Sequence, residues 1–443
     1  MPTTSETVTA LRGPALTFTG DPLLDGIERS VRHEPDALIV IENGTITAFG
    51  PYEATRHQLP AAAMVTHYGA DSLILPGFVD THVHYPQIQM IGAGGHALID
   101  WLGAYAFPAE QEFADPDHAR DVAGVFLREL LRAGTTTAAV YCTVFPQSVD
   151  AFFEASERLN TRMIAGKVLM DRHAPEGLCD TAQRGYDESK ALIARWHGRG
   201  RQLYAVTPRF APTSTPAQME TAGSLRKEHP GIYLQSHVCE NTAEIAWVRQ
   251  LYPGRRSYVD VYDHYGQLGP RAIYGHAVWF DEPDFRRFHE TGSAIAHCPT
   301  SNLFLGSGLF RMAEARRADR PVRVGLGTDL GAGTSFSPLA TMSEAYKVSQ
   351  LTGRPLSAMH AFYLATAGGA QALYLDDRIG SLAPGYEADL VVLDLRSTPL
   401  IDYRMQYCRT LEEALFVQLV LGDDRAVRAT YVAGSLKHER GER

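Results

Sequence analysis

The sequence predicts an α/β fold, a TIM-type (β/α)8 barrel with β-rich segments on either side of it. The first observation is an alternation of apolar, β-branched runs with helix-like stretches, repeated about eight times between residues 73 and 383. The second is that residues 1–72 and 384–443 have the pattern of short strands without this alternation. A doubly wound open sheet is the alternative, but no glycine-rich dinucleotide fingerprint follows an early strand.

The two end segments are rich in strand-forming residues. At residues 37–50, Asn43 and Gly44 separate two β-rich runs, which is a strong signal for a hairpin. Residues 388–395 and 428–437 have the same character near the other end of the chain. We therefore expect β structure on both sides of the barrel.

Within the barrel region, helix-like stretches follow the expected strands. In one of them Asp117 can cap a helix whose apolar residues fall on one face, and Gly134 can stop it. The expected strands lie in DSLILPGFVDTHVH, TTTAAVY, TRMIAGKVLM, QLYAVTPRF, IYLQSHV, RAIYGHAVWF, SAIAHCPTSN and VRVGLGTD. Eight strands of this kind are the number that a TIM-type barrel needs.

The composition limits the classes of partner. The formal net charge of −10 disfavours a nucleic-acid backbone or an anionic membrane as partner, whereas a neutral nucleobase stays possible. The five cysteines are scattered and form no CxxC pair, so we expect a reducing compartment, the cytoplasm. The chain shows no secretory signal pattern, and no apolar run approaches the ~18 residues that would span a membrane.

Polar side chains stand at the C-terminal ends of the expected barrel strands. Because these ends meet at one mouth of a barrel, where catalytic residues lie, the side chains should share one site. They are His82, His84, Arg209, His237, His276, His297 and Asp329. Taken singly, each has a simpler explanation, such as a hydrogen-bonded histidine or an aspartate that caps the next helix. Their convergence favours a metal centre.

The sequence His82-Val83-His84 supplies local geometry for metal binding. Residues i and i+2 of a strand face the same side, so both histidines can turn into the barrel while Val83 points into the helix layer. Neutral imidazole with a carboxylate suits zinc, and Fe²⁺ is the second choice. Glu240, three residues after His237, can shuttle protons beside a metal. Alone, it is better explained as a carboxylate in the first turn of a helix.

Several stretches together resemble the amidohydrolase superfamily, in its mononuclear branch that deaminates nucleobases and triazines: PGFVDTHVH, SHVCEN, YGHAVWF, AHCPTSNLFLGSGLF and GLGTDLGAGTSFSP. Within that branch the chain is similar to the guanine deaminases, on the stretches HYPQ, WLGAYAFPAEQEF, TPRFAPTST and GLGTDLGAGTSFS. The resemblance implies hydrolysis of guanine to xanthine and ammonia, a step of purine catabolism. It also implies a homodimer and a small β-sandwich built from both chain termini.

The resemblance further implies the roles of the site residues. One zinc ion would be held by four ligands: His82, His84, His237 and Asp329. Catalysis would use Glu240, His276 and Asp329, and the substrate pocket would use Gln87, Arg209 and Phe210.

The side-chain chemistry fits a purine that bears a keto group. Arg209 is a planar donor that suits O6 of guanine, and Gln87 can read a mixed edge of donors and acceptors. Phe210 and Trp101 can cover a ring face. The alternative for Arg209 is a structural ion pair.

Three features separate this chain from parts of the wider family. Binuclear relatives carry a metal-bridging lysine at the end of strand 4, whereas this strand ends in TPRF and Lys167 on strand 3 is expected to be structural. We therefore expect one metal per chain. Tyr85 stands where we expect a small residue in relatives, so the pocket edge should differ. Residues 92–113 form either a lid over the pocket or a packed surface loop, and His96 within them receives no role.

Two other functions remain open at this point. One is an aminohydrolase of the same branch that acts on an s-triazine, on cytosine or on a thioadenosine- or adenosylhomocysteine-type substrate. The other is a scaffold that kept the barrel without the chemistry, which the presence of all four expected ligands and of Glu240 disfavours.

Overall fold

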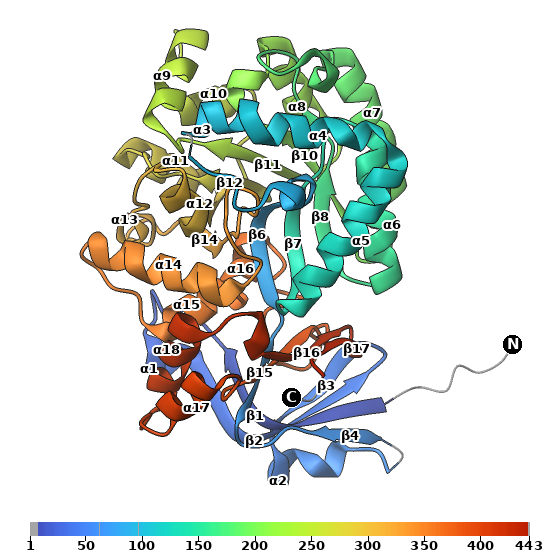
Figure 1. Ribbon diagram of the computed structural model, residues 1–443, viewed down its shortest axis with the longest axis vertical. Helices are drawn as coiled ribbons and strands as arrows, with labels where there is room; N and C mark the ends of the chain where they lie inside the picture. The colour runs from blue at the N-terminus through green and yellow to red at the C-terminus, as the bar shows by residue number, and fades with distance from the viewer. Residues whose placement is uncertain (1–7, 62, 96, 442–443) are drawn as a thin grey trace, which may run out of the picture.

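The structure is a computed structural model that describes residues 8–61, 63–95 and 97–441. Two parts are stacked along the long axis of the molecule (Figure 1). The upper part is a barrel of parallel strands surrounded by helices, and the lower part is a sheet built from both ends of the chain. The α/β barrel expected from the sequence is confirmed.

The barrel strands follow one another around the barrel in chain order, and each pairs in parallel with the next. Where the last strand meets the first, the backbone N–H of Asp329 donates to the carbonyl of His82 at 2.8 Å, which closes the sheet and excludes the open alternative. The strands are β6 (Phe78–His84), β7 (Thr135–Tyr141), β8 (Arg162–Gly166), β10 (Leu203–Pro208), β11 (Tyr233–Val238), β12 (Ala272–His276), β13 (Ala294–His297) and β14 (Arg323–Leu326), with a short β9 (Val168–Leu169) beside β10.

Helices cover the outside of the barrel between the strands (Figure 1). The first long one, α5 (Pro116–Arg132), is capped by Asp115, whose side chain accepts from the backbone N–H of Asp117 at 2.9 Å. The expected cap, Asp117, is therefore wrong by two residues, because Pro116 already occupies the first helical turn. The others are α6 (Pro146–Leu159), α7 (Ala182–Trp196), α8 (Pro216–Glu228), α9 (Thr242–Leu251), α10 (Tyr258–His264), α11 (Glu282–Thr291), α12 (Pro299–Phe304), α13 (Met312–Ala315), α14 (Pro338–Leu351), α15 (Ala358–Leu364) and α16 (Ala367–Ala372).

The two ends of the chain pair into one continuous sheet in the order β17-β16-β15-β5-β1-β2-β3, with β4 beside β1. This sheet confirms a second β part made from both termini. Asn43, with φ 51°, and Gly44 form the expected turn between β2 and β3. The strands are β1 (Val8–Phe18), β2 (Val31–Glu42), β3 (Thr45–Pro51), β4 (Met64–His67), β5 (Ser72–Pro76), β15 (Leu390–Asp394), β16 (Val427–Val432) and β17 (Ser435–Glu439).

Helices also occur within the end segments. α17 (Pro399–Met405) and α18 (Leu411–Leu421) interrupt the C-terminal segment, which the sequence had indicated as β-rich. Two shorter helices, α1 (Ile27–Ser30) and α2 (Tyr52–Thr55), lie in the N-terminal segment. The Thr398 and Thr410 side chains cap α17 and α18 by accepting from backbone N–H groups in their first turns.

The segment after β6 begins with a 3-10 helix (Tyr85–Met90), and after an irregular stretch over residues 91–95 it is helical from Leu98 on. This helical part consists of α3 (Leu98–Trp101), a π-helical turn (Leu102–Ala106) and α4 (Phe107–Gln111). Its apolar side chains share one buried cluster with Tyr141 of β7 and with Phe210. The segment therefore packs against the C-terminal ends of the barrel strands. His96 lies outside the described residues.

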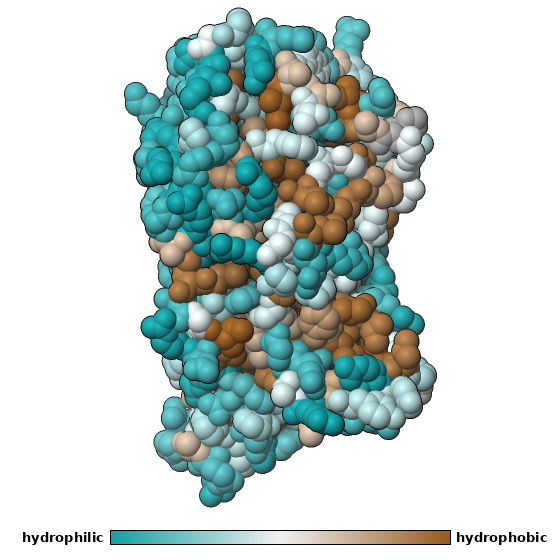
Figure 2. Space-filling view, turned by 90° about the vertical axis from the view of Figure 1, so that its left-hand side faces the viewer, coloured by the Kyte–Doolittle hydropathy of each residue, from teal (hydrophilic) through white to brown (hydrophobic). Residues whose placement is uncertain are grey.

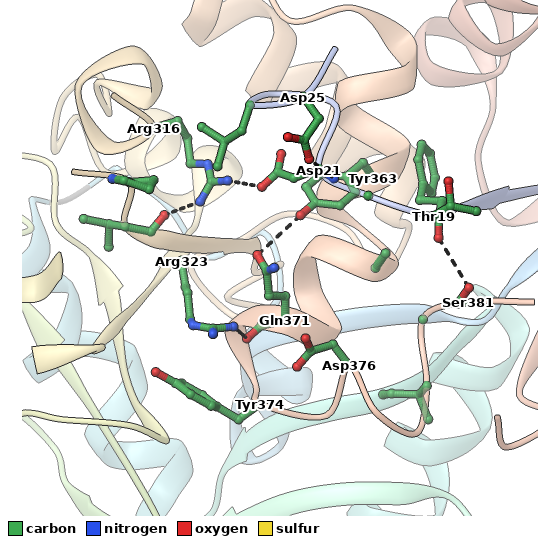
Figure 3. A pocket seen from close by; sticks show the side chains of 18 of the residues that line it. Thr19, Asp21, Asp25, Arg316, Arg323, Tyr363, Gln371, Tyr374, Asp376 and Ser381 are labelled. Carbon is green, nitrogen blue, oxygen red and sulfur yellow. Dashed lines mark hydrogen bonds and ion pairs between the residues drawn. The ribbon is translucent and has the colours of Figure 1, made fainter. Parts of the chain in front are cut away.

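A cavity of about 840 Å³ lies at the other end of the barrel, between the start of β14 and the end of β1. Charged and aromatic side chains line it (Figure 3). Arg316 pairs there with Asp21, and the Arg323 guanidinium lies 4.3 Å from the centre of the Tyr374 ring. None of the residues expected to carry chemistry lines this cavity.

Hydrophilic side chains cover most of the face shown in Figure 2, and separate apolar patches interrupt it. Among the helices of the described residues, none has both the length and the apolar character needed to cross a membrane. All five cysteines are free.

Candidate metal and substrate site

His82 and His84 both point into the barrel from β6, as the alternation of strand residues predicts. Val83 between them is fully buried in the helix layer, against α5 and α6 residues. The Nε2 atoms of His82 and His84 lie 3.2 and 3.3 Å from Oδ1 of Asp329, which follows β14. The two ends of the closed barrel sheet thus bring these three side chains together.

His237 at the end of β11 completes a group of four. Its Nε2 lies 3.1 Å from Nε2 of His84. Its Nδ1 lies 2.6 Å from the carbonyl oxygen of Arg209, which can only accept, so Nδ1 carries the hydrogen and Nε2 is free to bind a metal. One ligand atom from each of His82, His84, His237 and Asp329 lies within 4.8 Å of the others.

The protonation of this group fits a metal cation. Burial lowers the pKa of His84 to about 3 and that of His237 well below its usual value, so both rings are neutral. Burial alone would raise the pKa of Asp329, but the surrounding histidines, His82 first, hold it well below its usual value. The buried Nε2 of His82 makes no well-aligned hydrogen bond within the described residues, although Oδ1 of Asp329 lies 3.2 Å away. Neutral imidazoles beside a charged carboxylate are the donor set that zinc prefers.

A second possible group shares His82 and Asp329 and adds His276 and Cys298. The Cys298 thiol donates to the carbonyl of Ala296 at 3.4 Å, and burial raises its pKa well above the usual value. Because a thiol must lose its proton to bind a metal, the group with three histidines is the better site.

Glu240 and His276 lie beside this group. Oε2 of Glu240 is 3.4 Å from Nε2 of His276, which is in turn 3.8 Å from Oδ2 of Asp329. Burial, and then the charge of Asp329, raise the pKa of Glu240 to about 8. His276 and Asp329 hold left-handed backbone conformations, with φ of 75° and 48°, which are uncommon outside glycine and cluster at functional sites.

The four expected substrate residues line one narrow pocket together with Glu240, His276 and Asp329: they are Gln87, Trp101, Arg209 and Phe210. Leu98 and Leu102 of the helical segment also line it, so this segment is a wall of the pocket. The Trp101 indole N–H donates to the carbonyl of Ala93 at 2.7 Å, which leaves the ring as an apolar surface.

Arg209 forms the ion pair that was its alternative explanation, yet it still lines the pocket. One terminal nitrogen, Nη1, donates to both oxygens of Glu110 at 2.7 and 2.6 Å, and both side chains are buried. The pair uses only one of the three guanidinium nitrogens, so Nη2 and Nε are left for a ligand.

Three other expectations are decided by the structure. His297 lies against the Phe310 ring, 4.6 Å between centres, and does not line the pocket, so it does not share the site. Lys167 pairs with Asp180 and, at 3.3 Å, with Glu188, which is a structural arrangement. The expected effect of Tyr85 on the pocket edge is wrong. Its ring is buried against aromatic residues of the helix layer, and its hydroxyl donates to Ser148 O at 2.7 Å.

The sequence did not single out four residues that hold the site together. Glu110 binds Arg209, and Ser307 donates to Oε1 of Glu240 at 2.8 Å. Oδ1 of Asn302 lies 2.9 Å from Nδ1 of His276. Asp80 accepts from the backbone N–H groups of His82 and Thr328 at 3.1 and 3.0 Å. All four fall inside the stretches that carry the family resemblance, and that is the only signal that could have pointed to them.

Comparison with known proteins gives a consistent result. The profile of the Amidohydrolase family matches residues 73–437. A guanine deaminase of Escherichia coli (strain K12) is 50% identical over 437 residues, which are 98% of this chain and 98% of that protein. A probable guanine deaminase of Deinococcus radiodurans is 40% identical over 405 residues, or 90% of this chain and 92% of that protein. The solved structure of E. coli guanine deaminase has a TM-score of 0.95 at 50% identity, covering 98% of this chain and 100% of that one. The chain therefore belongs to the amidohydrolase family.

Proposed function

We propose that this protein is a guanine deaminase, a hydrolase that converts guanine and water to xanthine and ammonia. The observation that carries the proposal is the convergence of His82, His84, His237 and Asp329 beside the pocket that Glu240 and Arg209 line. The similarity to guanine deaminases over nearly the whole chain supports the choice of substrate.

We assign one zinc ion per subunit to these four residues, with Fe²⁺ as the alternative metal. A zinc ion held there would lower the pKa of a bound water from ~15.7 toward ~7 and so provide hydroxide at neutral pH. A second metal has no bridging lysine at the end of β10, where Pro208 and Arg209 stand, and Lys167 is already paired.

Glu240 is the proton carrier of the proposed reaction. It takes a proton from the attacking water and delivers it to ring nitrogen N3 of guanine, next to C2, where the water oxygen adds. Burial raises the pKa of this carboxyl group above its usual value, which favours uptake of a proton as well as its release. Asp329 accepts the second water proton and passes it to the amine on C2, which leaves as ammonia. His276 hydrogen-bonds the attacking oxygen.

The pocket walls orient the purine ring. Arg209 donates to O6 through the nitrogens that Glu110 does not engage, and Gln87 reads the adjoining ring edge. The rings of Phe210 and Trp101 pack on the faces of the substrate, where a flat apolar surface excludes water.

We also propose that the enzyme is a cytoplasmic homodimer, with neither a nucleic acid nor a membrane as partner. The free cysteines support a reducing compartment such as the cytoplasm. The formal net charge of −10 disfavours nucleic acids and anionic membranes as partners. Light scattering coupled to size-exclusion chromatography measures the oligomeric state directly, and a monomer at micromolar concentration would contradict the dimer.

The decisive test follows the ultraviolet spectrum as guanine is converted to xanthine, with and without a chelator. We expect conversion by the purified protein, its loss after chelation, and its recovery on adding back zinc or Fe²⁺. Metal analysis should give one ion per chain. A metal-loaded protein that leaves guanine unchanged, but releases ammonia from an s-triazine, cytosine or a thioadenosine, would overturn the assignment.

A further inference from the structure

Glu110 is a buried carboxylate that lies behind the pocket and contacts two of its lining residues. Its side chain is 1% exposed. Both of its oxygens accept from Nη1 of Arg209, and Oε1 also accepts from the amide nitrogen of Gln87 at 3.2 Å. Arg209 and Gln87 line the pocket, whereas Glu110 does not.

These contacts fix the direction in which two polar groups face. A carboxylate only accepts hydrogen bonds, so the Gln87 amide must turn its nitrogen toward Glu110, which turns its carbonyl oxygen away from Glu110. Arg209 is held at Nη1, and its guanidinium plane is further restrained by the Phe107 ring, 5.4 Å from Cζ. The pocket therefore presents fixed donors from Arg209 and a fixed acceptor from Gln87.

Glu110 also links these groups to the pocket wall. It belongs to α4, which continues the helical segment whose Leu98, Trp101 and Leu102 line the pocket. The segment packs on Phe210 through the same apolar cluster. The buried Glu110–Arg209 ion pair thus connects the helical wall of the pocket to the polar groups of Arg209 and Gln87 that would bind the edge of the purine.

We propose that Glu110 is a positioning residue that sets the specificity of the pocket for purines with a keto group at C6. The inference rests on the proposed function and deepens it. Donors from Arg209 match O6, and the Gln87 oxygen matches the N1–H that accompanies a keto group. A 6-amino purine loses both of these matches. Its amino group is a donor that faces the Arg209 donors, and its N1 is an acceptor that faces the Gln87 oxygen.

The test compares guanine with 2,6-diaminopurine, which also carries an amine at C2, by ammonia release from the zinc-loaded enzyme. In Glu110→Gln the KM for guanine should rise ~10-fold, with kcat and metal content nearly unchanged, because the lost charge-assisted contacts act on binding. The preference for guanine over 2,6-diaminopurine, as a ratio of kcat/KM, should fall ~10-fold as Gln87 and Arg209 lose their fixed orientation. A purely structural role would lower stability without changing this ratio.

Two further variants sharpen the test. Glu110→Asp keeps the charge but withdraws the carboxylate by one methylene, so it should show smaller changes in the same direction, and it decides the matter if Glu110→Gln does not fold. Glu112→Gln is the matched control, because Glu112 is 58% exposed on the same segment and contacts Gln89 instead of the pocket residues.

The outcomes separate this inference from the proposed function. Wild-type enzyme that acts on guanine, with an unchanged KM and substrate ratio in Glu110→Asp and in any folded Glu110→Gln, would overturn the role of Glu110 alone. Zinc-loaded wild-type protein that is inactive on guanine would refute the proposed function and this inference together. Changes in Glu112→Gln as large as those in Glu110→Gln would also overturn the role, since they would reflect charge loss on the segment.

Discussion

The hydroxyl of Ser307 donates to Oε1 of Glu240 at 2.8 Å, so one of the two carboxyl oxygens is held in place. Ser307 is itself fixed, because its carbonyl accepts from the Trp279 indole N–H at 2.9 Å. The other oxygen of Glu240 faces His276 Nε2 at 3.4 Å. Glu240 therefore presents a single, defined oxygen to the place where a proton must move.

Removing the Ser307 hydroxyl should slow turnover without emptying the site. We expect Ser307→Ala to lower kcat ~10-fold, about the effect of one hydrogen bond to an ionisable group, while KM and metal content stay close to wild type. Steady-state kinetics with guanine and metal analysis give the three quantities. Ser307→Thr keeps the hydroxyl and serves as the control. A wild-type kcat in the alanine variant would show that the bond does not position Glu240.

Replacing Glu240 itself should have a larger effect. Glu240→Gln keeps the shape and the Ser307 contact but cannot carry a proton, so kcat should fall by ~10²- to 10⁴-fold. Metal content should be unchanged, since the proposed ligand atoms lie on other residues. Near-normal turnover in this variant would remove Glu240 from the proton path.

The barrel and the convergence of polar side chains at its mouth could be predicted because their signals are local. Strand and helix patterns repeat along the chain, and the ends of parallel strands must meet at one mouth. The convergence of His82, His237 and Asp329 could therefore be predicted without knowledge of long-range contacts. The closing of β14 on β6, through Asp329 N–H and His82 O, is the physical event that turns these separate positions into one site.

The supporting contacts could not be predicted in the same way. Glu110 and Arg209 are 99 residues apart, and nothing in either local sequence specifies that they pair. The direction of Tyr85 depends on the turn after β6 and on which aromatic neighbours fill the helix layer. The sequence left residues 92–113 open between a lid and a packed surface loop, and the part from Leu98 on is helical because burial of its apolar face against Phe210 stabilises helix.

Removing Arg209 should weaken substrate binding far more than metal binding. Arg209→Ala deletes the donors to O6, so the KM for guanine should rise ~10- to 100-fold while the metal content is retained. It also leaves Glu110 buried without its partner, which should lower the free energy of unfolding by ~3–5 kcal/mol. Arg209→Ala combined with Glu110→Ala should recover part of the stability but none of the affinity. Unchanged guanine affinity would show that the proposed orientation of the substrate is wrong.

The raised pKa of Glu240 should appear in the stability of the metal-free protein. Its pKa is about 8 in the folded state, against ~4.3 in an unfolded chain, so the folded state binds the proton more tightly. The stability that the protonated form contributes is then fully present below the pKa of the unfolded chain, and it is lost as the pH rises toward 8. Glutamine has no such proton to lose.

We therefore expect the melting temperature of Glu240→Gln, minus that of wild type, to increase from pH 5 to pH 8 and to level off above it. Both proteins are measured after chelation, because a bound cation would favour the charged carboxylate. Glu244, whose pKa burial and then the charge of Glu240 raise to about 7, is present in both proteins. In Glu240→Gln that neighbouring charge is gone, so Glu244 ionises at less cost. This also makes the melting temperature of the variant, minus that of wild type, increase with pH. A difference that stays constant with pH would mean that the buried Glu240 carboxyl ionises as it does in water.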